Sequence, residues 1–106
     1  MPYGWCTWYA WQWRYDSGNP LPTGLGNARY WDDQLYGSYE VDHTPSYGAV
    51  FVGESGYYGH VGIVISDGVN EDGTITISDM NGPQGWGRVA TRTISASEWA
   101  TYSFIH

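Results

Sequence analysis

The chain has 106 residues, with four Arg and no Lys against eleven Asp and Glu, which gives a formal net charge of -7. This acidity argues against a nucleic-acid-binding surface, and no apolar run approaches the roughly 18 residues that a membrane span needs. The single cysteine excludes an internal disulfide and a multi-cysteine zinc site, and a hydrophobic content of 42% with 18% aromatics excludes a disordered chain.

The first predicted element is a helix. Residues 6–15 run without Gly or Pro up to a strong break at residues 16–20. A strand is the alternative here, because aromatic residues also suit strands. In the helix, the 3.6-residue period places Cys6 in the first turn, on one face with Ala10 and Trp13.

The remaining predicted elements are a second short helix and a series of strands. Asn27 is a candidate N-cap for a helix over residues 27–36. Ser95 and Glu98 match a capping box, which predicts one helical turn before the last strand. Helices first and an antiparallel sheet after predict one α+β domain over residues 1–106. The strands are expected at residues 49–52, 60–66, 74–79, 89–94 and 102–105.

The strands at residues 60–66 and 74–79 form the clearest predicted hairpin. If its turn is centred on Asn70, facing residues have numbers that sum to 139 or 140. With a sum of 139, His60 lies directly opposite Asp79 on one face of the sheet. With a sum of 140, the two side chains lie on opposite faces. An Asp beside a His fixes the tautomer of the imidazole and stabilises its protonated form.

Cys6 is the third candidate residue for a reaction centre. At a helix N-terminus, the backbone dipole and a neighbouring protonated His60 both stabilise a thiolate. Cys6, His60 and Asp79 thus match a nucleophile, a base and a residue that orients the base. The residue types alone leave another interpretation open, in which Cys6 is an inert buried side chain and His60 is structural.

Seven short motifs occur in an order and with gaps that resemble the CHAP domain, the cysteine, histidine-dependent amidohydrolase/peptidase family of peptidoglycan hydrolases. The resemblance covers nearly the whole chain. It implies a papain-like α+β fold, with N-terminal helices packed on an antiparallel β-sheet. It implies no cofactor, and the calcium loop of some relatives is not expected, because the five residues before Cys6 include no acidic one. The motifs are at residues 3–9, 24–28, 41–45, 48–50, 59–61, 77–81 and 104–106.

The resemblance also implies roles for single residues. Cys6 is expected to be the nucleophile and His60 the general base. Asp79 stands where the family usually has Glu, and Asn81 matches an Asn that is often counted as a fourth active-site residue. Trp5 stands where Gln commonly precedes the nucleophile, so backbone N–H groups around Cys6 are expected to hold the oxyanion.

The aromatic residues divide into two predicted groups. Trp8, Trp11 and Trp13 on the first helix cannot all face one side, and some of them are expected to pack on the sheet. Other aromatic residues flank the candidate catalytic residues and suit a groove for sugars and stem peptides. The candidate substrate-binding residues are Trp86, Tyr58 and Trp5, with Tyr57 a weaker candidate and His43 and His106 not expected to be catalytic.

The expected function is hydrolysis of bacterial peptidoglycan, as in a phage endolysin or a bacterial autolysin. The bond is either the muramoyl–L-alanine amide or a peptide bond of the stem or cross-bridge. Two alternatives stay open: a non-catalytic wall- or glycan-binding module, and an acyltransferase with the same three residues.

The expected setting is the cell wall, outside the cell, reached by secretion or by phage release, although the sequence shows no signal-peptide pattern. An acidic domain is repelled by anionic wall polymers, so a separate wall-binding domain or subunit is an expected partner. The isolated domain is expected to be a monomer.

Overall fold

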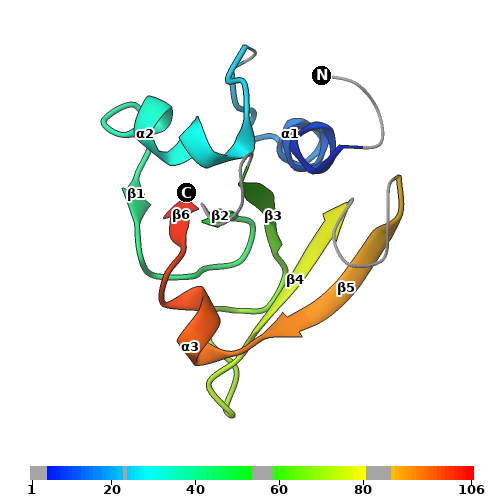
Figure 1. Cartoon of the computed structure of the whole chain (residues 1–106), viewed down its shortest axis with the longest axis vertical. Coiled ribbons are helices and arrows are strands. Elements are labelled where there is room, and N and C mark those ends of the chain that lie inside the picture. The colour runs from blue at the N-terminus through cyan, green and yellow to red at the C-terminus, as the bar shows by residue number, and fades with distance from the viewer. Residues whose placement is uncertain (1–4, 23, 54–58, 81–86) are drawn as a thin grey trace.

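The computed structural model describes residues 5–22, 24–53, 59–80 and 87–106 (Figure 1). Helical elements come first in the chain and most strands follow, as the sequence predicts. The elements in chain order are α1 (Cys6–Asp16), the 3-10 helix η1 (Ala28–Tyr30), α2 (Trp31–Leu35), β1 (Val41–Asp42), β2 (Val50–Gly53), β3 (His60–Val64), β4 (Ile75–Met80), β5 (Val89–Ile94), α3 (Ala96–Trp99) and β6 (Ser103–Ile105).

The six strands form one antiparallel sheet in the order β1-β6-β2-β3-β4-β5. Figure 1 shows α1 and α2 together at one end of the view and α3 at the other, with the strands between them. Helix α1 contacts β3 and β4, whereas α2 contacts β6. This arrangement confirms the predicted α+β architecture with N-terminal helices on an antiparallel sheet.

Two clusters of buried hydrophobic side chains cover the two faces of the sheet. Because side chains alternate along a strand, Val61 and Ile63 of β3 face the helices, and Val64 faces away from them. The helix-side cluster joins these valine and isoleucine side chains to Cys6 and Ala10 of α1 and to Trp31 of α2. The cluster on the opposite face contains Ala49, Phe51, Val64, Ile75, Ile77, Ile94, Tyr102 and Phe104.

The three residues predicted to share one face of α1 lie on the face that packs on the sheet. Cys6 and Ala10 are buried, and Trp13 is half-buried against the same cluster. The third fully buried residue of the helix is Arg14, which continues the row of residues four apart. A buried arginine was not predicted, since a charged side chain is rarely buried unless all its donors are paired.

Arg14 links α1 to the end of β6. Its side chain is 1% exposed and donates from Nε to the Asn19 carbonyl oxygen at 2.8 Å. Its Nη1 donates to the Ile105 carbonyl at 2.9 Å, and its Nη2 to the His106 carbonyl at 2.8 Å. One planar guanidinium thus satisfies three backbone acceptors from two distant parts of the chain.

We expect Arg14→Met to lower the free energy of unfolding by about 3 kcal/mol, because it removes a buried donor of three backbone hydrogen bonds, of which the one to Ile105 is buried and the other two are partly buried. In thermal melts this loss corresponds to a fall of roughly 10–20 °C. Arg14→Lys keeps the charge without the planar set of donors and should fall in between. Arg88→Met, on an exposed arginine, is the matched control. An equal loss in both Met variants would show that the buried contacts of Arg14 contribute little.

Two predicted helix caps are wrong in detail. The second helix divides into η1 and α2, and the side chain of Asn27, at the N-cap position, makes no capping hydrogen bond. Ser95 likewise precedes the predicted helical turn without a side-chain cap. The Glu98 carboxylate instead accepts a hydrogen bond at 2.7 Å from the hydroxyl of Tyr102, four residues further along the chain, so this local contact takes the place of the capping box.

The register of the β3–β4 hairpin also differs from the prediction. The numbers of facing residues sum to 141 rather than 139, since Ile63 faces Ser78 and Val64 faces Ile77. The reason is an uneven connector. Asn70 N–H donates to Thr74 O at the turn, so the turn is not centred on Asn70. Ile65 N–H donates to Thr76 O, which leaves residues 66–69 on one side against a single residue on the other. The shift of two residues preserves which side chains share a face.

Candidate active site

The N-terminus of α1 places Cys6 at the beginning of β3. Trp5 has an extended backbone (φ -99°, ψ 151°) and Cys6 is the first helical residue. The Cys6 side chain is 9% exposed and makes no disulfide. Its sulfur accepts hydrogen bonds from the backbone N–H groups of Thr7 and Val61 and contacts His60. The thiol therefore lies between the first turn of the helix and the N-terminal end of β3, a central strand of the sheet.

His60 and Asp79 are hydrogen-bonded across the sheet. His60 Nε2 lies 2.7 Å from Asp79 Oδ2, with 26% of the histidine side chain exposed and none of the aspartate. In the observed register Asp79 faces Gly62, so His60 is its diagonal neighbour rather than its direct partner. The predicted side-chain pair is thus present, although the predicted direct pairing is wrong. Nε2 faces the carboxylate, which leaves Nδ1 for the thiol.

Two glycines make room for this pair. A Cβ at Gly62 would lie 2.8 Å from Asp79 Cβ and even closer to the ring of Phe51, so only glycine fits there. The ring of Phe51, 5.9 Å from the imidazole between centroids, supports His60 from the buried side. Gly59 has a positive φ of 73°, and a Cβ there would lie 2.6 Å from the backbone nitrogen of Arg29. Glycine before His60 therefore lets η1 approach the beginning of β3.

Cys6, His60 and Asp79 stabilise one another's charged forms. Burial alone would raise the pKa of the Cys6 thiol, but the hydrogen bond and charge of His60 lower it below its ordinary value. Burial would lower the pKa of His60, yet its bonds to Asp79 and Cys6 raise it to about 9. Burial would raise the pKa of Asp79, whereas His60 and Arg92 hold it below its usual range. The arrangement favours a thiolate beside an imidazolium at neutral pH.

Arg92 is a residue at this site that sequence reasoning missed. Its Nη2 lies 2.7 Å from Asp79 Oδ2, and its Nε lies 3.3 Å from the same oxygen. Arg92 faces Ile77 on β4, which makes it the diagonal neighbour of Asp79 on the side opposite to His60. A signal was present in the sequence. Arg92 is one of only four basic residues, and in a two-residue period it shares the inward face of its strand with Ile94.

Several predicted site residues lie outside the described part of the chain. They are Asn81, Tyr57, Tyr58 and Trp86, so their proposed roles stay predictions. Trp5 is described and is 48% exposed next to Cys6. Trp11 and Trp13 are half-buried against the helix-side cluster, which agrees with their predicted packing role, and Trp8 is also half-buried.

The other two histidines have partners of their own. His43 Nδ1 lies 2.9 Å from the Tyr102 carbonyl oxygen. His106 bridges Ser46 Oγ and Asp42 Oδ1, each at 2.7 Å, and thereby ties the end of β6 to β1 and to the segment before β2. These contacts give both histidines structural roles.

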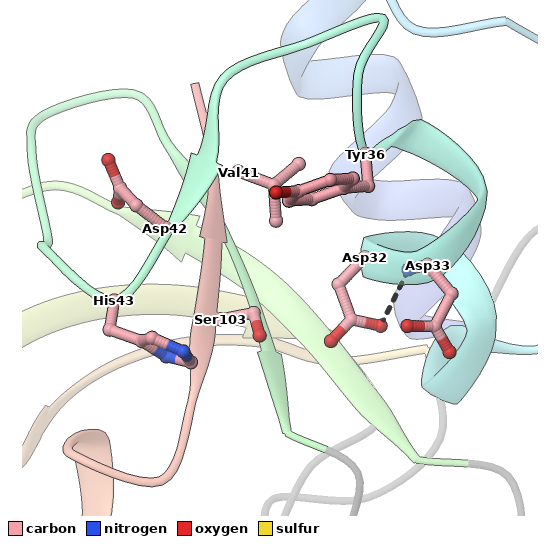
Figure 2. A pocket seen from close by; sticks show the side chains of 7 residues that line it. All are labelled: Asp32, Asp33, Tyr36, Val41, Asp42, His43 and Ser103. Atoms are coloured by element: carbon pink, nitrogen blue, oxygen red, sulfur yellow. Dashed lines mark hydrogen bonds between the residues drawn. The ribbon is translucent and has the colours of Figure 1, made fainter.

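A pocket of about 540 Å³ opens beside α2 and β1. Figure 2 shows Asp32 and Asp33 on its helical side, with His43 and Ser103 across from them, whereas Asp42 points away. The Asp32 carboxylate accepts a hydrogen bond from the Asp33 backbone N–H. The pocket includes none of Cys6, His60 and Asp79, so its lining is separate from the candidate reaction centre. It is lined by Asp32, Asp33, Tyr36, Val41, Asp42, His43 and Ser103.

The described residues include neither a cluster of metal ligands nor a membrane-spanning helix. No group of three or more His, Cys, Asp or Glu side chains among residues 5–22, 24–53, 59–80 and 87–106 lies close enough to hold a metal ion. In the same part of the chain, no helix has the length and apolar character needed to cross a membrane.

Known proteins similar to this chain include a domain family and several staphylococcal proteins. The family model for the CHAP domain matches residues 1–81. The Staphylococcus aureus protein named "Probable autolysin SsaALP" is 42% identical over 104 residues, which cover 97% of this chain and 38% of that protein. The N-acetylmuramoyl-L-alanine amidase sle1 of Staphylococcus epidermidis is 37% identical over 105 residues, which cover 98% of this chain and 32% of that protein.

A solved structure gives the same result for the fold. The crystal structure of an N-acetylmuramoyl-L-alanine amidase from Staphylococcus aureus matches with a TM-score of 0.88 and 38% identity, covering 99% of this chain and 31% of that one. The likeness confirms the papain-like α+β fold. The chain spans about two fifths or less of the length of the curated relatives named above.

Proposed function

The chain belongs to the CHAP domain family, and on that premise we propose that it is a peptidoglycan hydrolase with Cys6 as its nucleophile. The observation that carries the proposal is the continuous contact from the Cys6 thiol through His60 to the buried Asp79 carboxylate. This order of groups matches what a cysteine hydrolase needs: a nucleophile, a base beside it and an acceptor that orients the base. Family membership supports the assignment of these roles to the matching residues.

In the proposed reaction, the Cys6 thiolate attacks the carbonyl carbon of an amide in the wall peptide. The oxyanion is held by the backbone N–H of Cys6 at the N-terminus of α1, where the helix dipole also favours a negative charge. Protonated His60 gives its Nδ1 proton to the leaving amine as the C–N bond breaks, and a thioester remains on Cys6. Neutral His60 then takes a proton from water, which attacks the thioester and releases the acid.

The bond is proposed to be the muramoyl–L-alanine amide or a peptide bond of the stem or cross-bridge. The proposed setting is the bacterial wall outside the cell. Two relatives carry names that fit this setting, an autolysin and an N-acetylmuramoyl-L-alanine amidase. The acidity of the chain favours a separate wall-binding domain or subunit, because a net charge of -7 is repelled by anionic wall polymers.

Mass spectrometry of digested peptidoglycan tests the proposal. We expect the chain to release new amino groups, on L-alanine if the muramoyl amide is cut and on another residue if a peptide bond is cut. Because Cys6 is the only cysteine, iodoacetamide modifies one known site and provides the matched inactive sample. Wall binding that survives alkylation, with no new amino groups from the unmodified chain, would identify a binding module instead. Transfer of the acyl group to an added amine in place of hydrolysis would identify an acyltransferase.

A further inference from the structure

We propose that Arg92 is a positioning residue of the reaction centre, which keeps Asp79 charged and oriented through the whole catalytic cycle. The inference rests on the proposed function, since it assigns Arg92 a role in the same reaction. One carboxylate oxygen, Asp79 Oδ2, accepts hydrogen bonds from both His60 and Arg92, each at 2.7 Å.

The sheet places Asp79 between these two partners. β4 lies between β3 and β5, and Asp79 has His60 as diagonal neighbour on one side and Arg92 on the other. The Asp79 side chain is fully buried, whereas those of His60 and Arg92 are 26% and 29% exposed. A carboxylate without contact with water needs a counter-charge within the protein.

His60 cannot supply that counter-charge at every step. It is protonated beside the thiolate and becomes neutral once it has protonated the leaving amine. At that stage Asp79 would be a buried negative charge facing a neutral ring, and it would draw a proton back. Arg92 stays protonated at all relevant pH values, so its guanidinium compensates Asp79 while His60 is neutral. The proton of His60 is thus free to leave for the substrate.

The groups around Arg92 agree with this role. Asp79 contacts two charged groups, His60 of β3 and Arg92 of β5. His60 in turn contacts Cys6. On the other side, the charge of Arg92 is favoured by Glu98 of α3 and by Tyr102, which donates to Glu98 at 2.7 Å. Arg92 is therefore the cation between two carboxylates, and only one of them contacts the imidazole.

The proposed role of Arg92 predicts that its loss raises the pKa of His60. Arg92→Gln removes a positive charge close to His60, so protonated His60 becomes more stable and its pKa rises by about one unit. The pH at which hydrolysis declines on the alkaline side of the pH–rate profile, its alkaline limb, should rise with this pKa. The rate at pH 7 should fall about tenfold, because the imidazolium gives up its proton less readily. A merely structural loss at this position would lower the melting temperature without moving that limb upward.

The test is an NMR titration of the His60 imidazole, together with pH profiles of peptidoglycan hydrolysis. Arg92→Lys keeps the charge and should restore the wild-type pKa of His60 with an intermediate rate, and Arg92→Met replaces the Gln variant if that one fails to fold. Arg88→Gln removes the same charge from an exposed site and should leave the pKa unchanged. An unchanged or lowered His60 pKa in Arg92→Gln, or an equal shift in Arg92→Lys, would overturn the proposal. The titration needs no substrate, so it decides the role of Arg92 even if the wild-type chain fails to cut peptidoglycan.

Discussion

Cys6→Ala is expected to reduce peptidoglycan hydrolysis by about four orders of magnitude or more, to the level of a sample without enzyme, because no other group can form the thioester. The fold should survive the change. Cys6 is a small side chain at one end of α1, and its replacement removes one sulfur atom from a well-filled cluster. The free energy of unfolding should therefore fall by no more than about 1–2 kcal/mol. The measurement is the release of amino groups from purified walls, with circular dichroism as the check on folding.

The matched control for Cys6→Ala is Ala10→Ser, which alters a buried small residue one helical turn away on the same face. It perturbs packing by a similar amount and leaves the thiol in place, so it should retain most of the activity. Clearing of walls by Cys6→Ala at a rate near that of the wild type would reject the cysteine mechanism. Equal losses in the two variants would point to a damaged helix instead.

Much of the fold could be predicted from local patterns. The helix at residues 6–15 and the strand at residues 89–94 are bounded by breaks in the sequence, and the structure has them within one residue. The two caps failed because a cap depends on where a side chain finds its best partner. For Glu98 that partner is the hydroxyl of Tyr102, four residues further along the chain, rather than the backbone N–H of Ser95.

The candidate site likewise has one part that the sequence predicts and another that depends on the folded structure. His60 and Asp79 could be placed on one face because the two-residue period of a strand is insensitive to a shift of two residues. Their diagonal contact could not be predicted, since it depends on how the connector at residues 66–69 folds. Arg92 was missed because its partner is on a neighbouring strand, and the sequence alone does not give the register between β4 and β5.

Asp79→Asn is expected to lower the rate of hydrolysis by roughly two to three orders of magnitude while the chain stays folded. The amide has the shape of the carboxylate but no charge, so His60 loses its counter-charge. One carboxylate oxygen also becomes an NH2 donor, which no longer fixes the tautomer of the imidazole as two acceptor oxygens do. The pKa of His60, about 9 in the wild type, should fall toward its ordinary value of about 6.5. Since the imidazolium is the proposed acid for the leaving amine, the alkaline limb of activity should move down in pH.

The pKa of His60 should also set how the stability of the fold depends on pH. In the wild type the pKa of His60 is raised above that of the unfolded chain, so protonated His60 stabilises the fold fully below about pH 6.5, and this contribution is lost as pH rises through about 9. Asp79→Asn should reduce that pH dependence to the part that Cys6 contributes, which thermal melts across this range will measure. Asp67→Asn, an exposed carboxylate in the same hairpin, is the charge-matched control and should change neither the rate nor the limb. A full rate in Asp79→Asn would remove Asp79 from the proposed reaction centre. A lowered rate with an unmoved alkaline limb would keep Asp79 only as a packing residue beneath His60.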